Sequence, residues 1–90
     1  MRAIVTVLGK DKPGIIAKIS GALLEYQGNI VDITQTVLRD EYFAMIMMVD
    51  LSNMTASFEE WKRFMEKSAE EIQMEIKIQR EEFFQSMHRI

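Results

Sequence analysis

Residues Gly9–Gly14, with the sequence GKDKPG, separate the two patterns that decide the fold. Before them, Ala3–Leu8 is a run rich in β-branched residues, which predicts a strand. After them, apolar residues at helical spacing begin with Ile15 and Ile16 and predict a helix. A glycine-bounded turn between a strand and a helix exposes backbone N–H groups at the helix N-terminus, where the helix dipole favours negative charge. The stretch therefore predicts a site for a small anionic group.

The first helix is expected to extend to about Gln27. Pro13 is tolerated in a first turn, Asp11 can cap that turn, and Gly28 suits the position just after a helix. The expected apolar stripe consists of Ile15, Ile16, Ile19, Leu23, Leu24 and Tyr26.

Two strands are expected next, at about residues 30–39 and 42–51, joined by a short charged hairpin link. The earlier strand alternates apolar and polar residues, which predicts one buried and one wetter face. Its apolar positions are Val31, Ile33 and Val37. The later strand is apolar on both faces, which is typical of a strand in the middle of a sheet.

Ser57 and Glu60 form a capping-box pattern that predicts a second helix over residues 57–71. Alternation from Met74 to Gln79 predicts a fourth strand. The order βαββαβ indicates an α+β fold: a ferredoxin-like sandwich with a four-stranded antiparallel sheet and both helices on one face. The first and third strands are expected at the centre, and the second and fourth at the edges.

Ninety residues predict a single domain spanning 1–90. The net charge of −3 and the absence of cysteine argue against nucleic-acid binding, disulfides and thiolate chemistry. We expect a cytoplasmic protein that does not bind membranes, because the chain shows neither a signal peptide nor an apolar run of spanning length. His88 is a lone histidine, so neither a metal site nor a cofactor is expected. No nucleophile or acid–base pair can be named, and no enzyme is predicted.

The face of the sheet away from the helices predicts an interface. Ile46, Met48 and one side of the first strand would leave apolar area exposed in a monomer, and the second strand would be an unpaired edge. A homo-oligomer is therefore expected. The alternative is that the tail Phe83–Ile90 covers this face.

Two pieces of the sequence resemble the ACT domain, a small regulatory module that most often senses amino acids. They are Lys10–Ile16 after a strand and Gly28-Asn29-Ile30 at the start of the next one. The ending Ile76–Ile90 resembles the stand-alone UPF0237 family, whose members end in a similar Met-His-Arg-Ile. The resemblance spans the whole chain, with 81–90 as a family-type tail.

The resemblance implies dimers formed side by side through the first helix and the second strand. Ligands of such domains sit between the first strand–helix loop of one protomer and the second strand of its neighbour. The implied ligand-binding residues are Asp11, Gly14, Ile15, Asn29 and Ile30. The family commonly has arginine where Lys12 stands, which weakens the prediction of a bidentate carboxylate contact there.

Each of these residues also has a structural interpretation. Gly14 can serve loop geometry alone, Asp11 can be a helix cap, and Asn29 can be a turn residue. Lys10 and Lys12 can attract an anion or belong to a solvated loop. Small residues on the first helix, which can favour close packing across a dimer or on the chain's own sheet, are Ala17, Ser20 and Gly21.

The leading hypothesis is a non-catalytic regulatory protein that binds a small molecule, an amino acid, as a homodimer or tetramer. The alternative is a protein-interaction adaptor that uses the open sheet face or the C-terminal tail without a ligand.

Overall fold

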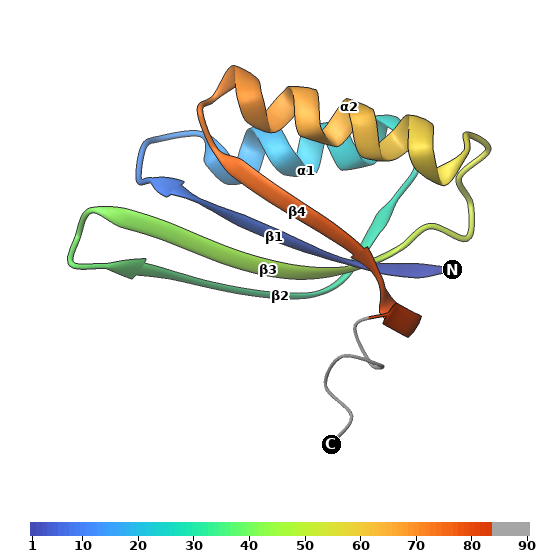
Figure 1. Cartoon of the computed structure of the whole chain (residues 1–90), viewed down its shortest axis with the longest axis horizontal. Helices are drawn as coiled ribbons and strands as arrows, with labels where there is room; N and C mark the ends of the chain where they lie inside the picture. Colours follow the sequence, from blue (N-terminus) through green and yellow to red (C-terminus); the bar gives the residue numbers. More distant parts are fainter. Residues whose placement is uncertain (84–90) are drawn as a thin grey trace.

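The computed structural model describes residues 1–83, and its elements follow the order expected from the sequence. They are β1 (Arg2–Lys10), α1 (Ile15–Glu25), β2 (Asn29–Leu38), β3 (Tyr42–Asp50), α2 (Phe58–Glu71) and β4 (Glu75–Arg80). The strands form one antiparallel sheet in the order β2-β3-β1-β4. Both helices lie on one face of this sheet (Figure 1). The predicted ferredoxin-like sandwich is confirmed, with β1 and β3 at the centre.

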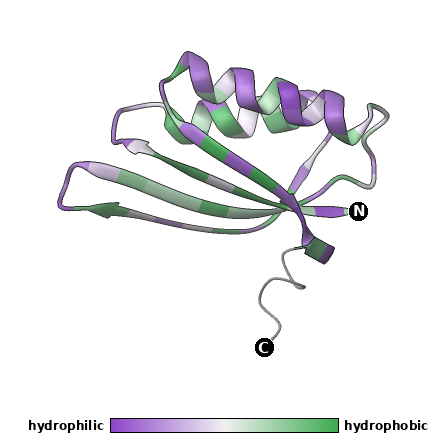
Figure 2. Cartoon of the chain, in the orientation of Figure 1, coloured by the Kyte–Doolittle hydropathy of each residue, from purple (hydrophilic) through white to green (hydrophobic). Residues whose placement is uncertain are grey.

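The core lies between the sheet and the helices. Val5 of β1 pairs with Met47 of β3 on one side and with Ile78 of β4 on the other, so all three side chains point toward the helices. Trp61 and Met65 of α2 are fully buried above them. α2 carries many hydrophilic residues, while α1 and the central strands are largely hydrophobic, as Figure 2 shows. This pattern is the alternation that burial of one face of a sheet requires.

The start of α2 agrees with the sequence. The side chain of Ser57 accepts a hydrogen bond from the Glu60 N–H at 3.1 Å, which supplies one of the partners that a helix N-terminus lacks. The Glu60 carboxylate does not close the capping box. It accepts instead from the hydroxyl of Tyr26 at 3.4 Å, and so connects the start of α2 to the end of α1.

The start of α1 differs from the prediction. The helix begins at Ile15, its N-cap is Gly14 with a left-handed φ of 87°, and no side chain caps it. Pro13 lies in the turn before the helix. Asp11 is not the cap: its N–H donates to the carbonyl of Glu41 at 2.9 Å and links this loop to the β2–β3 hairpin. Hence the amino end of α1 carries no side-chain partner, in contrast to that of α2.

The end of α1 also differs from the prediction. The helix ends at Glu25, and the left-handed residue that follows is Gln27, with φ 63°, rather than Gly28. The N–H of Gly28 donates to the carbonyl of Leu23 at 3.0 Å, as in a Schellman motif. Gly28 is required for space, because a Cβ there would lie 2.4 Å from Leu23 Cδ1. The end of α2 repeats the motif with Gln73 at φ 58°.

Replacing Gln27 by glycine is expected to stabilise the protein by about 0.5–1 kcal/mol, because glycine adopts a left-handed conformation without a steric cost. Urea unfolding of the variant measures the change. Gln35→Gly is the matched control, since Gln35 lies inside β2, where glycine weakens a strand. Equal effects of the two substitutions would contradict the assignment of strain to Gln27.

A three-residue link, Arg39–Glu41, joins β2 and β3. Arg39 and Asp40 both have positive φ, 56° and 55°, and the Glu41 N–H donates to the Leu38 carbonyl at 3.0 Å. This is the geometry of the tight turns that connect hairpin strands. The hairpin predicted from the charged link is therefore confirmed.

The open sheet face carries exposed apolar side chains near the hairpin end. Ile46 is 51% exposed and Leu38 is 55% exposed, while Met48 is half-buried. Leu8 and Tyr42 are exposed as well. Phe83 is the last described residue, so most of the tail named as the alternative cover for this face lies outside the described residues.

No helix within residues 1–83 is long and apolar enough to cross a membrane. In the same residues, no group of three acidic, histidine or cysteine side chains is placed to hold a metal ion, and His88 lies outside that range.

Candidate functional site at the amino end of the first helix

The loop before α1 is held by Lys12. The ammonium of Lys12 donates to the carbonyl of Ile72 at 2.8 Å and to the side-chain oxygen of Gln73 at 3.4 Å. These acceptors lie at the end of α2, where helix carbonyls have no internal partner and the dipole favours a cation. Lys12 therefore fixes the loop to α2. Its contacts do not support the alternative that it attracts a free anion.

Replacing Lys12 by methionine is expected to destabilise the fold by about 0.5–1.5 kcal/mol, because the carbonyl at the end of α2 loses its charged donor. Thermal unfolding measures the loss. Lys10→Met serves as the control, since Lys10 is an exposed lysine at the end of β1, just before the loop. An unchanged melting temperature for Lys12→Met would show that the contact with Ile72 does not hold the loop.

The backbone at the start of α1 is free to bind. The first bond inside the helix runs from the Lys18 N–H to the Gly14 carbonyl at 3.0 Å, so the N–H groups of Ile15, Ile16 and Ala17 precede it without a helical acceptor. A Cβ built on Gly14 would meet nothing within 4 Å, so the space beside this backbone is open. Ile15 is itself buried and can offer only its backbone N–H. This end of α1 has the amides and the dipole that hold an anion.

Asn29 and Ile30 lie at the other end of α1. The helix has 11 residues, which corresponds to a length of about 16 Å. Asn29 is exposed and pairs opposite Asp50, whereas Ile30 is partly buried against the core. Asp11, Gly14 and Ile15 thus lie together in one chain, but Asn29 and Ile30 do not join them.

Asp50, opposite Asn29, has a stabilised carboxylate. Two hydrogen bonds from Ser52, from its hydroxyl at 2.5 Å and from its N–H at 2.9 Å, lower the pKa of Asp50 below its ordinary value of 3.8. A lowered pKa in the folded state stabilises the fold above the ordinary pKa, and this contribution is lost as the pH falls through the lower value.

Asp50→Asn is therefore expected to make the unfolding free energy fall less steeply on acidification below pH 3.8. Urea unfolding of both proteins at a series of pH values measures the two slopes. Parallel slopes would show that the bonds from Ser52 do not favour the charged carboxylate.

One edge of the molecule exposes apolar side chains that the sequence pattern predicted to be buried. We call it the α1–β2 edge and define it by four residues: Ile16 and Leu24 of α1, and Ile33 and Val37 of β2. Leu24 is 72% exposed. Ile33 and Val37 pair with Met47 and Phe43, so they face the helix side of the sheet.

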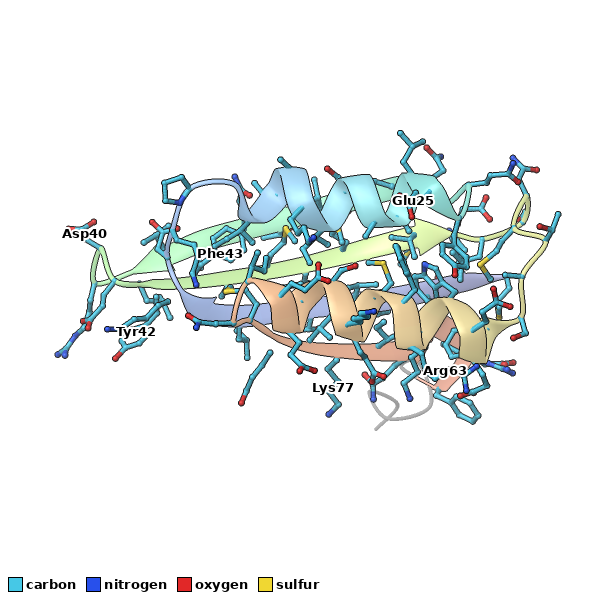
Figure 3. All side chains as sticks on the ribbon, turned by 90° about the horizontal axis from the view of Figure 1, so that it is seen from above. Glu25, Asp40, Tyr42, Phe43, Arg63 and Lys77 are labelled. Carbon is cyan, nitrogen blue, oxygen red and sulfur yellow. The ribbon has the colours of Figure 1, made fainter. Side chains whose placement is uncertain are left out.

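The cause of this exposure is the position of the helix layer. α1 lies toward β2 and α2 toward β4 (Figure 3), but only α2 makes substantial contact with its edge strand. The buried side of α1 consists of Ile15, Ile19, Ala22 and Leu23. Val31 is exposed for a different reason, because the register shifts between Ile30 and Asp32 and leaves it in a bulge.

The width of the α1 apolar stripe could have indicated this edge. Adjacent apolar pairs, Ile15-Ile16 and Leu23-Leu24, cover more of the helix surface than one core contact needs. The second member of each pair is exposed. Such a stripe predicts two apolar contacts for one helix, one inside the chain and one outside it.

Comparison with known proteins agrees with this fold. The ACT domain family model matches residues 2–79. A UPF0237 protein of Listeria innocua is 49% identical over 90 residues, which is 100% of each chain. The structure of an ACT domain protein from Streptococcus pneumoniae is 43% identical, covers 93% of each chain and has a TM-score of 0.81. The ligand-free regulatory subunit of aspartate kinase from Thermus thermophilus is 26% identical over 87% of this chain and 50% of that one, with a TM-score of 0.68.

The matches over nearly the whole chain, together with the similar solved structures, identify this βαββαβ sandwich. The chain belongs to the ACT domain family and, within it, to the UPF0237 proteins.

Proposed function

We propose that this protein is a non-catalytic regulator in the cytoplasm that binds an amino acid as a homo-oligomer, at a site shared by two protomers. The observation that carries the proposal is the free amino end of α1, which lies beside an uncovered apolar edge. The relation to the regulatory subunit of aspartate kinase supports a regulatory role.

The chemistry of the site suits the two ends of an amino acid. The N–H groups at Ile15 and Ile16 would donate to its carboxylate, and the absence of a side chain at Gly14 lets that carboxylate approach. Asp11, which is exposed, would accept from its ammonium. Asn29, with a donor and an acceptor, would bind the remaining polar group. Ile30 would contact the apolar side chain of the bound amino acid.

A second protomer is needed to bring Asn29 to the amides. A twofold axis perpendicular to α1 that pairs two α1–β2 edges would run the two α1 helices in opposite directions. The amino end of each α1 then meets the Asn29 end of its partner. The same contact covers Leu24 and Ile33, so dimer formation and assembly of the site are one event. A bound amino acid stabilises this dimer in proportion to its affinity for it.

Thermal unfolding in the presence of each of the twenty amino acids tests the proposal. At 100 times its dissociation constant, a ligand adds about 2.7 kcal/mol to the stability of the bound protein. Gly14→Val and Asn29→Ala should each abolish the ligand-dependent shift, whereas Lys77→Ala, on β4 at the opposite edge of the sheet, should keep it. Unchanged melting with all twenty amino acids would contradict the proposal.

A protein-interaction adaptor is the second candidate, and the exposed apolar residues of the open sheet face favour it. In this case a partner protein would contact Ile46 and Leu38 and no amino acid would bind. Capture of a partner by the full chain, and its loss in Ile46→Lys, would support the adaptor. Capture that does not depend on Ile46 would count against this face as the binding surface.

A further inference from the structure

A pocket of about 710 Å³ lies at the opposite edge of the sheet from the α1–β2 edge. It is bounded by the first turns of α2, the end of β4 and the residues that follow β4. Its lining consists of Phe58, Glu59, Lys62, Ile78, Gln79, Arg80 and Phe83. The volume is in the range of sites that hold small organic ligands.

Aromatic and aliphatic groups form the apolar part of this pocket. Phe58 packs against the buried Trp61 with ring centroids 5.6 Å apart, so it is a fixed wall. Ile78 is buried at the floor, and Phe83 is 59% exposed at the rim. A planar apolar group that entered this pocket would stack on the exposed ring of Phe83 and contact Phe58 beside Arg80, which lies over the Phe58 ring.

The pocket is positively charged although the protein is acidic. Lys62 and Arg80 line it together with a single acidic residue, Glu59, whereas the whole chain has a net charge of −3. Arg80 faces the helix side of β4, since it pairs with the buried Ala3. The charge of the lining therefore favours an anion over a cation.

Arg80 is held in place but keeps donors for a ligand. Its guanidinium carbon lies over the Phe58 ring, 4.8 Å from the ring centroid, in a cation–π contact that does not consume its N–H donors. Glu82, at 3.9 Å, is a long and solvent-exposed ion-pair partner. A carboxylate beside Arg80 could accept two parallel hydrogen bonds.

We propose that this α2–β4 pocket is a second ligand site, which binds a small carboxylate with an aromatic body. The carboxylate lies between Arg80 and Lys62, and the ring lies against Phe58 and Phe83. The site is separate from the proposed amino-acid site, because it uses neither the amino end of α1 nor a second protomer.

Titration of ¹⁵N-labelled full-length protein with 3-phenylpropionate tests the proposal. We expect saturable amide shifts concentrated in residues 58–62 and 78–83, and none there with phenethylamine, which has the same ring without a carboxylate. Arg80→Gln should weaken binding about tenfold, because a charge-assisted hydrogen bond is lost. Lys62→Gln, a substitution on the surface of α2, should also weaken binding of 3-phenylpropionate.

Lys77→Gln is the matched control, because it removes one positive charge from β4 on the opposite face, where Lys77 pairs with Thr6. Its binding should equal that of the unmodified protein. The proposal is overturned if the shifts do not saturate, if they concentrate at residues 11–17, or if Arg80→Gln and Lys62→Gln bind as well as Lys77→Gln does. Ile33→Glu changes the other edge of the sheet and should bind 3-phenylpropionate as the unmodified protein does. The result for this pocket therefore does not depend on whether the amino-acid proposal holds.

Discussion

Ile33→Glu is expected to convert the protein into monomers of 10.5 kDa without unfolding it. Ile33 is exposed in the single chain, so a carboxylate there is solvated in the monomer. In the proposed dimer the same carboxylate would be buried without a partner, which costs several kcal/mol. Sedimentation velocity measures the mass, and circular dichroism measures the fold.

Thr34→Glu is the control for this experiment. Thr34 is the next residue of β2 and is also exposed, but it pairs with Ile46 and lies on the open sheet face. We expect Thr34→Glu to keep the mass of the unmodified protein. Dissociation by Thr34→Glu and not by Ile33→Glu would move the interface to the open face and contradict the α1–β2 edge as the contact.

Gly28→Ala is expected to destabilise the protein by about 1–3 kcal/mol, because the added methyl group overpacks the core. Its Cβ would lie 2.4 Å from Leu23 Cδ1 and 2.9 Å from Leu23 Cγ. Leu23 is only 1% exposed and cannot move into solvent. Chemical denaturation gives the change in unfolding free energy.

Gly21→Ala is the matched control and is expected to have the opposite sign. Gly21 lies inside α1, and a Cβ there would meet nothing within 4 Å. Alanine should therefore stabilise the helix by about 0.5–1 kcal/mol. A stabilising Gly28→Ala would show that Leu23 can repack. A destabilising Gly21→Ala would point to a close contact at this position that the single chain does not have.

Two of the three small residues of α1, Ala17 and Gly21, line a groove together with Phe64 and Ser68 of α2. Both are exposed and lie beside α2, so close packing on the chain's own sheet is not their role. Close packing across a dimer stays a prediction. Pattern alone placed them on one side of α1, but which neighbour that side meets depends on how the helices pack.

The sequence predicted the order, type and approximate bounds of all six elements, because alternation and helical spacing record which side of each element is buried. The sequence predicted that Ile33 and Val37 of β2 are buried, and this prediction was wrong. These residues do face the helix side, but α1 does not pack closely on β2. Alternation tells which residues share a face and cannot tell whether another layer covers it.

The candidate site was predicted less completely than the fold. The open backbone at Gly14 follows from the GKDKPG stretch, since a glycine before an apolar helical pattern indicates exposed amides. The roles of Asp11 and Lys12 could not be predicted, because their partners, Glu41 and Ile72, are distant in sequence. The sequence predicted Gly28 as the residue just after the helix, but the left-handed residue there is Gln27. Gly28 is a glycine because a Cβ at that position would collide with Leu23.

Mixing two inactive variants tests the shared site most directly. Gly14→Val and Asn29→Ala each damage both sites of a homodimer. In a mixed dimer, one site combines the unmodified loop of one protomer with the unmodified Asn29 of the other. After subunit exchange, calorimetry with the amino acid that stabilises the unmodified protein most should recover one site per mixed dimer. No recovery on mixing, with exchange verified by mass spectrometry, would place both groups in sites within one chain and contradict the account.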